Sequence, residues 1–114
     1  MNPDMRDFAI RELGCTACSM YGVAYRVMCE KHHLNAHDQP GGKRRGERYT
    51  VGLCQWHHVG RCHCTGAVRD CDMCRVKHGP SWRHHKRDFI ETFGDGDGFL
   101  AIQDARIERW RKHG

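Results

Sequence analysis

The sequence predicts a small α+β protein that is stabilised by zinc, and three observations lead to this fold class. The 114 residues include eight Cys and ten His, and the Cys occur in closely spaced pairs that are typical of zinc ligands. Two short segments rich in strand-forming residues flank a loop rich in Gly and Arg. Two segments near the C-terminus have helical periodicity. We therefore expect one domain in which bound metal contributes to folding.

The expected elements follow a simple order along the chain. Residues 1–13 are expected to be a short, loosely tied N-terminal arm, and residues 14–114 the folded domain. A first strand is expected to begin within 23–29 and end at His32 and His33, and a second to span 49–53, with a loop at 35–48 between them. A helical turn over 54–59, a Cys-rich insertion at about 61–79 and helices over 82–93, capped by Ser81, and 99–112 complete the chain.

Cysteine usage and charge restrict the compartment and the partners. Eight Cys could form four disulfides in a secreted protein. However, the N-terminus lacks the apolar segment of a signal peptide, and no apolar run is long enough to cross a membrane. Zinc-like spacing then indicates a reducing compartment, so we expect a cytoplasmic protein with no membrane partner. The net charge of +5, with clustered Arg, favours a polyanionic partner, although on charge alone an ordinary solvated surface explains it equally well.

A first structural zinc site is predicted from two pairs of ligands with the same spacing. Two residues separate the members of each pair, which lets both turn toward one metal ion. A lone Cys-x-x-Cys could instead be a redox pair, but the βαβ context of such pairs is missing. Two pairs complete a tetrahedral set, and the four predicted ligands are Cys15, Cys18, Cys54 and His57.

A second structural zinc site is predicted within the Cys-rich insertion. Four thiols within thirteen residues are a strong zinc signal by themselves, and they fill all four positions, so the site has no room for substrate. His63 and His78 are competing ligands in the same segment. The four predicted ligands are Cys62, Cys64, Cys71 and Cys74.

Three further His flank the Cys54–His57 pair and belong to neither zinc set: His32, His33 and His58. Neighbouring residues on a regular strand face opposite ways, so His32 and His33 cannot both ligate one metal from such a strand. One can bind a metal ion while the other faces a substrate water, a role that suits imidazole because its pKa lies near neutrality.

This arrangement resembles the HNH, or ββα-metal, nucleases. In these proteins a metal-binding Asp or His precedes a general-base His at the end of the first strand, and a metal-binding His follows on the helix, often just after a zinc knuckle. The adjacent pair His32-His33 and the run Cys54-x-x-His57-His58 match these features. More narrowly, the chain resembles the phage recombination-enhancement (Ref) family over about residues 14–110, through Gly14-Cys15, His33-Leu34, Gly52-Leu53-Cys54, His57-His58, Phe89 and Phe93-Gly94.

The resemblance implies a zinc-stabilised ββα-metal core with two C-terminal helices and a specific set of roles. His33 would be the general base, and His32 and His58 would bind one catalytic divalent ion (Mg²⁺, Mn²⁺ or Zn²⁺), beside two structural Zn²⁺. A late His would complete that ligand set, with His84 preferred and His85 as the alternative. The implied activity is metal-dependent, RecA-dependent DNA cleavage by a phage-encoded endonuclease in a bacterial host cell, with DNA and a RecA filament as partners.

Two features depart from the family or extend it. The Asn of the HNH motif would lie near Tyr49 and is absent, and the insertion at 61–79 has no counterpart in the family. A basic run in the inter-strand loop is expected to contact DNA phosphates, and the alternative is a solvated loop. Its residues are Lys43, Arg44, Arg45 and Arg48.

Two other functions fit part of the pattern. The His cluster could hold a third structural zinc in a non-catalytic, zinc-finger-like protein that binds nucleic acid. The chain could also be a zinc-scaffolded adaptor that binds protein. Metal-dependent cleavage of plasmid DNA would distinguish the nuclease from the non-catalytic nucleic-acid-binding protein. Salt-sensitive DNA binding would distinguish both of these from the adaptor.

Overall fold

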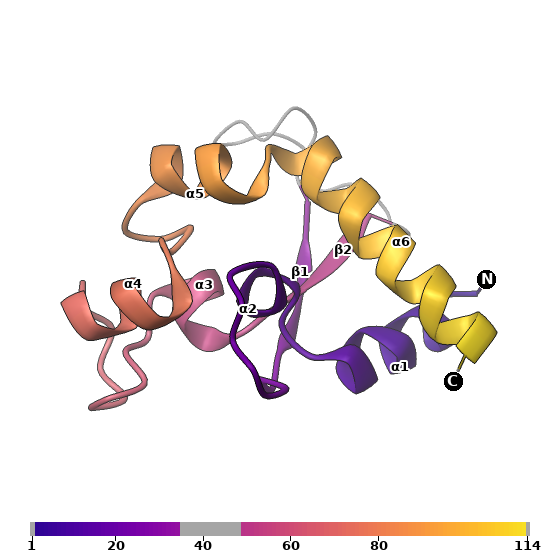
Figure 1. Ribbon diagram of the computed structural model, residues 1–114, viewed down its shortest axis with the longest axis horizontal. Coiled ribbons are helices and arrows are strands. Elements are labelled where there is room, and N and C mark those ends of the chain that lie inside the picture. Colours follow the sequence, from indigo (N-terminus) through magenta and orange to yellow (C-terminus); the bar gives the residue numbers. More distant parts are fainter. Residues whose placement is uncertain (1, 35–48, 114) are drawn as a thin grey trace.

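The computed structural model describes residues 2–34 and 49–113, so the loop with the basic run 43–48 lies outside the described residues. Figure 1 shows two strands at the centre of the molecule with helices around them. The small mixed fold, with a two-stranded sheet and two C-terminal helices, agrees with the expected class. The elements in order are α1 (Pro3–Leu13), α2 (Thr16–Met20), β1 (Glu30–His33), β2 (Thr50–Leu53), α3 (Gln55–Val59), α4 (Asp72–His78), α5 (Lys86–Phe93) and α6 (Gly96–His113).

The sheet is an antiparallel pair in which Glu30 faces Leu53 and His33 faces Thr50. The four residues of β1 are half-buried, whereas all four of β2 are buried. The expectation that the first strand begins within 23–29 is wrong. The backbone of that segment bonds to the region of α2 instead of to β2, because Cys15 N donates to Val27 O (2.8 Å) and Val23 N donates to Cys18 O (3.1 Å).

The N-terminal segment is a packed helix, which corrects the expectation of a loosely tied arm. Pro3 is at its start, and the side chain of Asn2 accepts a hydrogen bond from the Met5 amide (2.9 Å). Ile10 is fully buried, in a small cluster with Ile107 of α6. The two chain ends therefore lie at the same end of the molecule, where α1 meets α6 (Figure 1).

The helices after the sheet differ in extent from the expectation. Helix α4 lies within the Cys-rich insertion, where the sequence predicts no helix. Helix α5 begins at Lys86 rather than Trp82, and Ser81 does not cap it, since the Ser81 amide donates to His85 Nδ1 (3.1 Å) and 82–84 form a turn. Helix α6 begins at Gly96, three residues early. No described helix is long and apolar enough to span a membrane.

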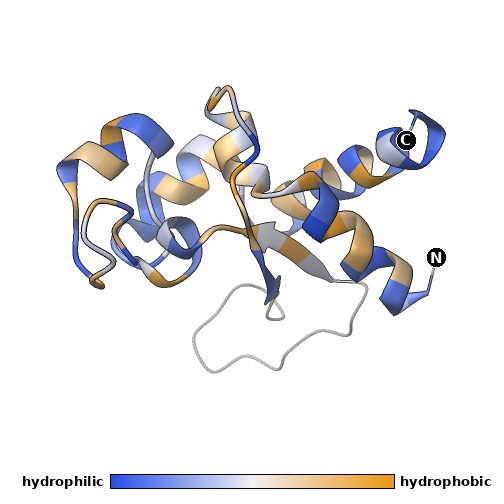
Figure 2. Ribbon diagram, turned by 90° about the horizontal axis from the view of Figure 1, so that it is seen from below, coloured by the Kyte–Doolittle hydropathy of each residue, from blue (hydrophilic) through white to orange (hydrophobic). Residues whose placement is uncertain are grey.

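The main core lies between the sheet, α2, α3 and α5 and contains Trp56, Phe89, Phe93 and all the Cys of the two predicted zinc sets except the exposed Cys64. Figure 2 shows that the helices carry both hydrophobic and hydrophilic residues, as expected for helices with one face in a core.

One buried amide joins three elements. Gln103 of α6 is fully buried, and its Oε1 accepts hydrogen bonds from Thr16 Oγ1 of α2 and from the Gly52 amide of β2, both at 2.8 Å. The backbone N–H of Gly52 can only donate, so the oxygen of the Gln103 side chain, and not its nitrogen, must face Gly52. The sheet that carries His32 and His33 is thereby attached to both flanking helices.

Candidate metal centres

The first predicted zinc set comes together at the start of two short helices. Cys15 is the N-cap residue of α2, which also carries Cys18, and Cys54 is the N-cap residue of α3, which also carries His57. All four residues are buried, and their ligand atoms lie within 4.8 Å of one another. We call this group site 1. Each helix contributes two ligands because one helical turn brings a cap residue and the residue three places later to the same side.

The dimensions of site 1 fit a tetrahedral zinc ion. Cys18 Sγ lies 3.7 Å from Cys54 Sγ. His57 Nδ1 lies 3.4 Å from Cys15 Sγ, 3.6 Å from Cys18 Sγ and 3.3 Å from Cys54 Sγ. A tetrahedron with Zn–S bonds of about 2.3 Å and a Zn–N bond of about 2.0 Å requires S–S edges of about 3.8 Å and S–N edges of about 3.5 Å. Site 1 could therefore hold a structural zinc ion without rearrangement.

A second layer of contacts orients the imidazole of His57. Its Nε2 donates to the backbone carbonyl of His78 at 2.7 Å, so Nδ1 is the nitrogen that faces the three sulfurs. Ligating His residues in metal sites commonly have such a partner on the other ring nitrogen. The ring of His78 also contacts site 1, with Nδ1 3.3 Å from Cys18 Sγ.

The thiol pKa values of site 1 show that the protein by itself favours a single thiolate. Burial opposes ionisation of Cys15, but hydrogen bonds from Cys18, Cys54 and His57 outweigh it and hold its pKa well below the ordinary value. The hydrogen bond with Cys15 raises the pKa of Cys18, and the same cause raises that of Cys54 to about 12. A divalent cation would supply the positive charge that full ionisation of the three thiols requires.

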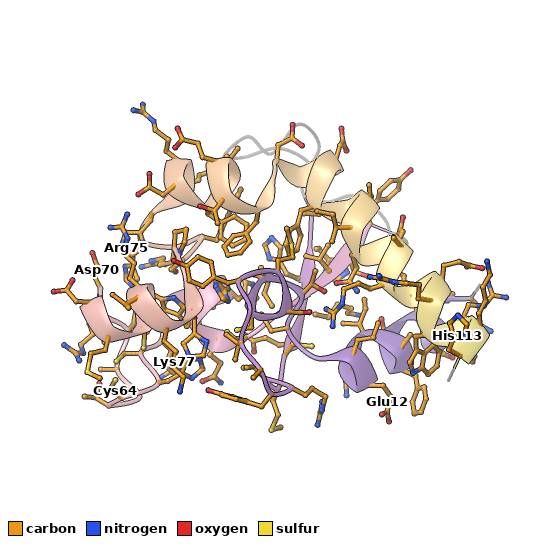
Figure 3. All side chains as sticks on the ribbon, in the orientation of Figure 1. Glu12, Cys64, Asp70, Arg75, Lys77 and His113 are labelled. Atoms are coloured by element: carbon orange, nitrogen blue, oxygen red, sulfur yellow. The ribbon has the colours of Figure 1, made fainter. Side chains whose placement is uncertain are left out.

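The second predicted zinc set is also assembled, and we call it site 2. The four sulfur atoms of Cys62, Cys64, Cys71 and Cys74 lie within 4.8 Å of one another. Two separations, Cys71–Cys64 and Cys74–Cys62, are 3.9 Å, close to the tetrahedral edge. Cys64 is the exposed member, and Figure 3 shows it at the outer end of the molecule near α4, far from Glu12 and His113.

Burial and hydrogen bonds shift the thiol pKa values of site 2 in opposite directions, since burial raises the pKa of Cys74 to about 12 while that of Cys62 is lowered. The amides of His63 and Cys64 donate to Cys74 Sγ and Cys62 Sγ, each at 3.3 Å. Burial opposes ionisation of Cys62, but the hydrogen bond from Cys71 and bonds from backbone amides lower its pKa to about 5. The competing ligands His63 and His78 are outside this set; their rings pack against each other with centroids 4.8 Å apart.

The structure also brings two of the three remaining His together. His32 of β1 and His58 of α3 have ring centroids 4.7 Å apart. Glu30, at the start of β1, accepts a hydrogen bond from His58 Nδ1 on Oε1 at 2.8 Å, which leaves Nε2 of His58 as the nitrogen able to bind a metal ion. Glu30 has no signal in the sequence, because it is 28 positions from His58 and only the pairing of β1 with β2 brings the two together.

The late His residues are held by hydrogen bonds of their own. His84 Nε2 donates to Gly60 O at 2.9 Å. His85 uses both ring nitrogens, because Nε2 lies 2.8 Å from Asp70 Oδ1 and Nδ1 accepts from Ser81. Of the two, only His84 retains a ring nitrogen without a hydrogen bond to a described residue. His33 ends β1 and is half-buried.

The described residues contain two groups of three or more ligand atoms within 4.8 Å of one another, and these are sites 1 and 2. His32, His58 and His84 do not form a third group by this measure. The predicted DNA contacts Lys43, Arg44, Arg45 and Arg48 are outside residues 2–34 and 49–113. The ring centroids of His32 and Trp82 are 6.3 Å apart. Lys86 Nζ lies over the Trp82 ring, 4.7 Å from its centroid.

A two-stranded sheet followed by a helix, with two Cys/His clusters that could hold zinc, makes this a small mixed α/β protein with candidate metal sites. Compared with known protein families, the chain matches the family described as recombination enhancement, RecA-dependent nuclease, over residues 4–108. The protein belongs to this family. No curated protein and no solved structure matches the chain.

Proposed function

We propose that this protein is a metal-dependent endonuclease of the HNH (ββα-metal) type that hydrolyses phosphodiester bonds of DNA in a RecA-dependent reaction. The observation that carries the proposal is the pair His32–His58, with Glu30 on the far nitrogen of His58. Metal sites in proteins commonly combine His ligands with a carboxylate that is hydrogen-bonded to the other ring nitrogen of one of them. Here the two His come from a strand and from the helix after the next strand.

The proposed catalytic site holds one divalent ion through His32 and His58, with His84 as the third protein ligand. Three protein ligands leave a coordination position open for substrate, unlike the closed sets of sites 1 and 2. When bound, such an ion stabilises the charge that develops on the phosphate and on the leaving oxygen. His84 would bind the ion through Nδ1, because its Nε2 donates to Gly60 O.

His33 is the proposed general base. It follows His32 on β1, so the strand directs the two side chains differently, and the end of a strand allows the ring of His33 to turn toward the attacking water. The base takes a proton from that water as its oxygen bonds to phosphorus and the bond to the leaving oxygen breaks.

DNA and RecA are the proposed partners. The family description names RecA dependence and nuclease activity, and the net charge of +5 suits a polyanion. We retain Lys43, Arg44, Arg45 and Arg48 as proposed phosphate contacts.

Cleavage by the purified, zinc-loaded protein tests this function. Supercoiled and single-stranded DNA are incubated with Mg²⁺ or Mn²⁺, with and without RecA and ATP. Conversion to nicked or linear products that requires both the divalent ion and RecA is expected. Salt-sensitive DNA binding without cleavage under any of these conditions would contradict the proposal and favour the non-catalytic zinc protein.

A further inference from the structure

The two zinc sites are joined by one short helix, α4. Its first turn belongs to site 2, since Cys71 is its N-cap residue and Cys74 lies within it. Its last residue, His78, contacts site 1 twice: the backbone carbonyl accepts from His57 Nε2 at 2.7 Å, and the ring Nδ1 lies 3.3 Å from Cys18 Sγ. Helix α4 and its N-cap residue thus provide two ligands of site 2, and its last residue contacts two ligands of site 1.

The two buried residues of α4 are the ones that take part in site 2 and contact site 1. Of its seven residues, Cys74 and His78 are buried, while Met73 and Val76 are exposed by 72% and 78%. Helix α4 also forms an exposed ion pair between Arg75 and Asp88, and such a pair contributes little on its own. A helix of this length is not stable alone, so its placement depends on what holds its two ends.

The connection at the C-terminal end continues beyond His78. Trp56 Nε1 donates to the carbonyl of the next residue, Gly79, at 2.9 Å. Trp56 and His57 are neighbours on α3, so the end of α4 contacts α3 at two adjacent residues. A shift of α4 would disturb the His57 contact and the Cys18 contact together.

We propose that site 2 is a support for site 1: by holding α4 in place, it makes His78 a positioning residue that orients His57 and donates to the Cys18 sulfur. Filling site 2 then raises the metal affinity of site 1. Second-layer partners of metal ligands are typically worth about 10- to 100-fold in metal affinity. This inference concerns the structural metals and does not require the protein to cleave DNA, so its test is independent of the proposed function.

Cobalt binding measures each site separately in the full chain. Site 1 offers three sulfurs and one nitrogen and site 2 offers four sulfurs, so Co²⁺ at the two sites gives distinguishable charge-transfer and d–d absorption. The metal-free protein, kept reduced, is titrated with Co²⁺ in competition with a chelator of known affinity. Three variants are compared with the unchanged protein: Cys64→Ser, His78→Phe and His113→Phe.

The variants separate the two parts of the proposal. Cys64→Ser disables site 2 at its exposed ligand and should weaken Co²⁺ binding at site 1 by about 10-fold or more. His78→Phe keeps an aromatic ring and the backbone carbonyl but removes the nitrogen near Cys18, and should weaken site 1 while leaving site 2 unchanged. His113→Phe is the matched control, because His113 is exposed at the end of α6, far from Cys64 (Figure 3), and should leave both sites within twofold.

Two results would overturn the proposal. One is a site 1 affinity within twofold of the unchanged protein in both Cys64→Ser and His78→Phe. The other comes from the unchanged protein, which decides the matter if Cys64→Ser does not fold: Co²⁺ should bind site 1 about 10-fold or more tightly when site 2 is filled than when site 2 is empty. Equal affinity of site 1 with site 2 filled and with site 2 empty contradicts the proposal.

Discussion

Glu30 and His58 form a hydrogen-bonded pair that joins the first strand to the first helix after the sheet, with Oε1 2.8 Å from Nδ1. The pair is partly exposed, with side-chain exposures of 44% for Glu30 and 25% for His58. The hydrogen bond uses Nδ1 of His58, so Nε2 is the nitrogen that could bind a metal ion. The His58 ring lies beside the ring of His32. The other His of the same helix, His57, is oriented in the same way by the carbonyl of His78.

Replacing Glu30 by Gln should weaken the catalytic metal site without unfolding the protein. Gln can still accept the hydrogen bond, but it lacks the negative charge that makes the imidazole a better ligand, so the Mn²⁺ concentration needed for half-maximal cleavage should rise about 10- to 100-fold. Glu91→Gln, at an exposed position of α5, is the matched control and should behave as the unchanged protein. An unaltered Mn²⁺ dependence in Glu30→Gln would show that the pair does not serve a metal ligand.

Removing the structural zinc should unfold the protein, because the ligation free energy of sites 1 and 2 is part of the folding free energy. Many of the core residues are themselves the Cys ligands, so little apolar packing remains once the metal is gone. Thermal unfolding followed by circular dichroism, before and after removal of zinc by a strong chelator under reducing conditions, measures this. The zinc prediction fails if the stripped protein keeps a cooperative transition near the original temperature.

Replacing the buried Gln103 by Met should cost about 1–3 kcal/mol of stability, since the Thr16 hydroxyl and the Gly52 amide would lose their shared acceptor inside the protein. The same substitution at Gln55, which is exposed on α3, should change stability by less than about 0.5 kcal/mol. Urea unfolding with zinc in excess compares the two. Equal stability of both variants would mean that the Gln103 hydrogen bonds do not hold α2, β2 and α6 together.

The two clusters of candidate zinc ligands could be predicted from the sequence because their chemistry is local. The members of each pair are two or three positions apart along the chain, and the fold only has to bring two pairs together. The second strand and the helical turn after it were also predictable, since Thr50–Leu53 is a compact run of strand formers that leads directly into a cap at Cys54.

The features that the sequence did not predict depend on contacts between distant segments. Residues 23–29 have strand-forming side chains, but their backbone bonds to α2 and not to a partner strand. Glu30 meets His58 only when β1 pairs with β2. The start of α5 moves to Lys86 because the ring of His85 accepts from the Ser81 amide and its other nitrogen contacts Asp70, interactions that helical periodicity does not reveal.

The most direct test of the catalytic assignment is a paired measurement on His33→Ala and His58→Ala, in which DNA cleavage in the presence of RecA and Mn²⁺ and the content of bound metal are determined for both. His33→Ala should lose about 10²–10⁴ in cleavage rate while retaining the catalytic metal and both zinc ions, and His58→Ala should lose cleavage and the catalytic metal together. Cleavage by His33→Ala at near the original rate would contradict its role as general base. Loss of the catalytic metal from His33→Ala would show that His32 and His33 have the opposite roles.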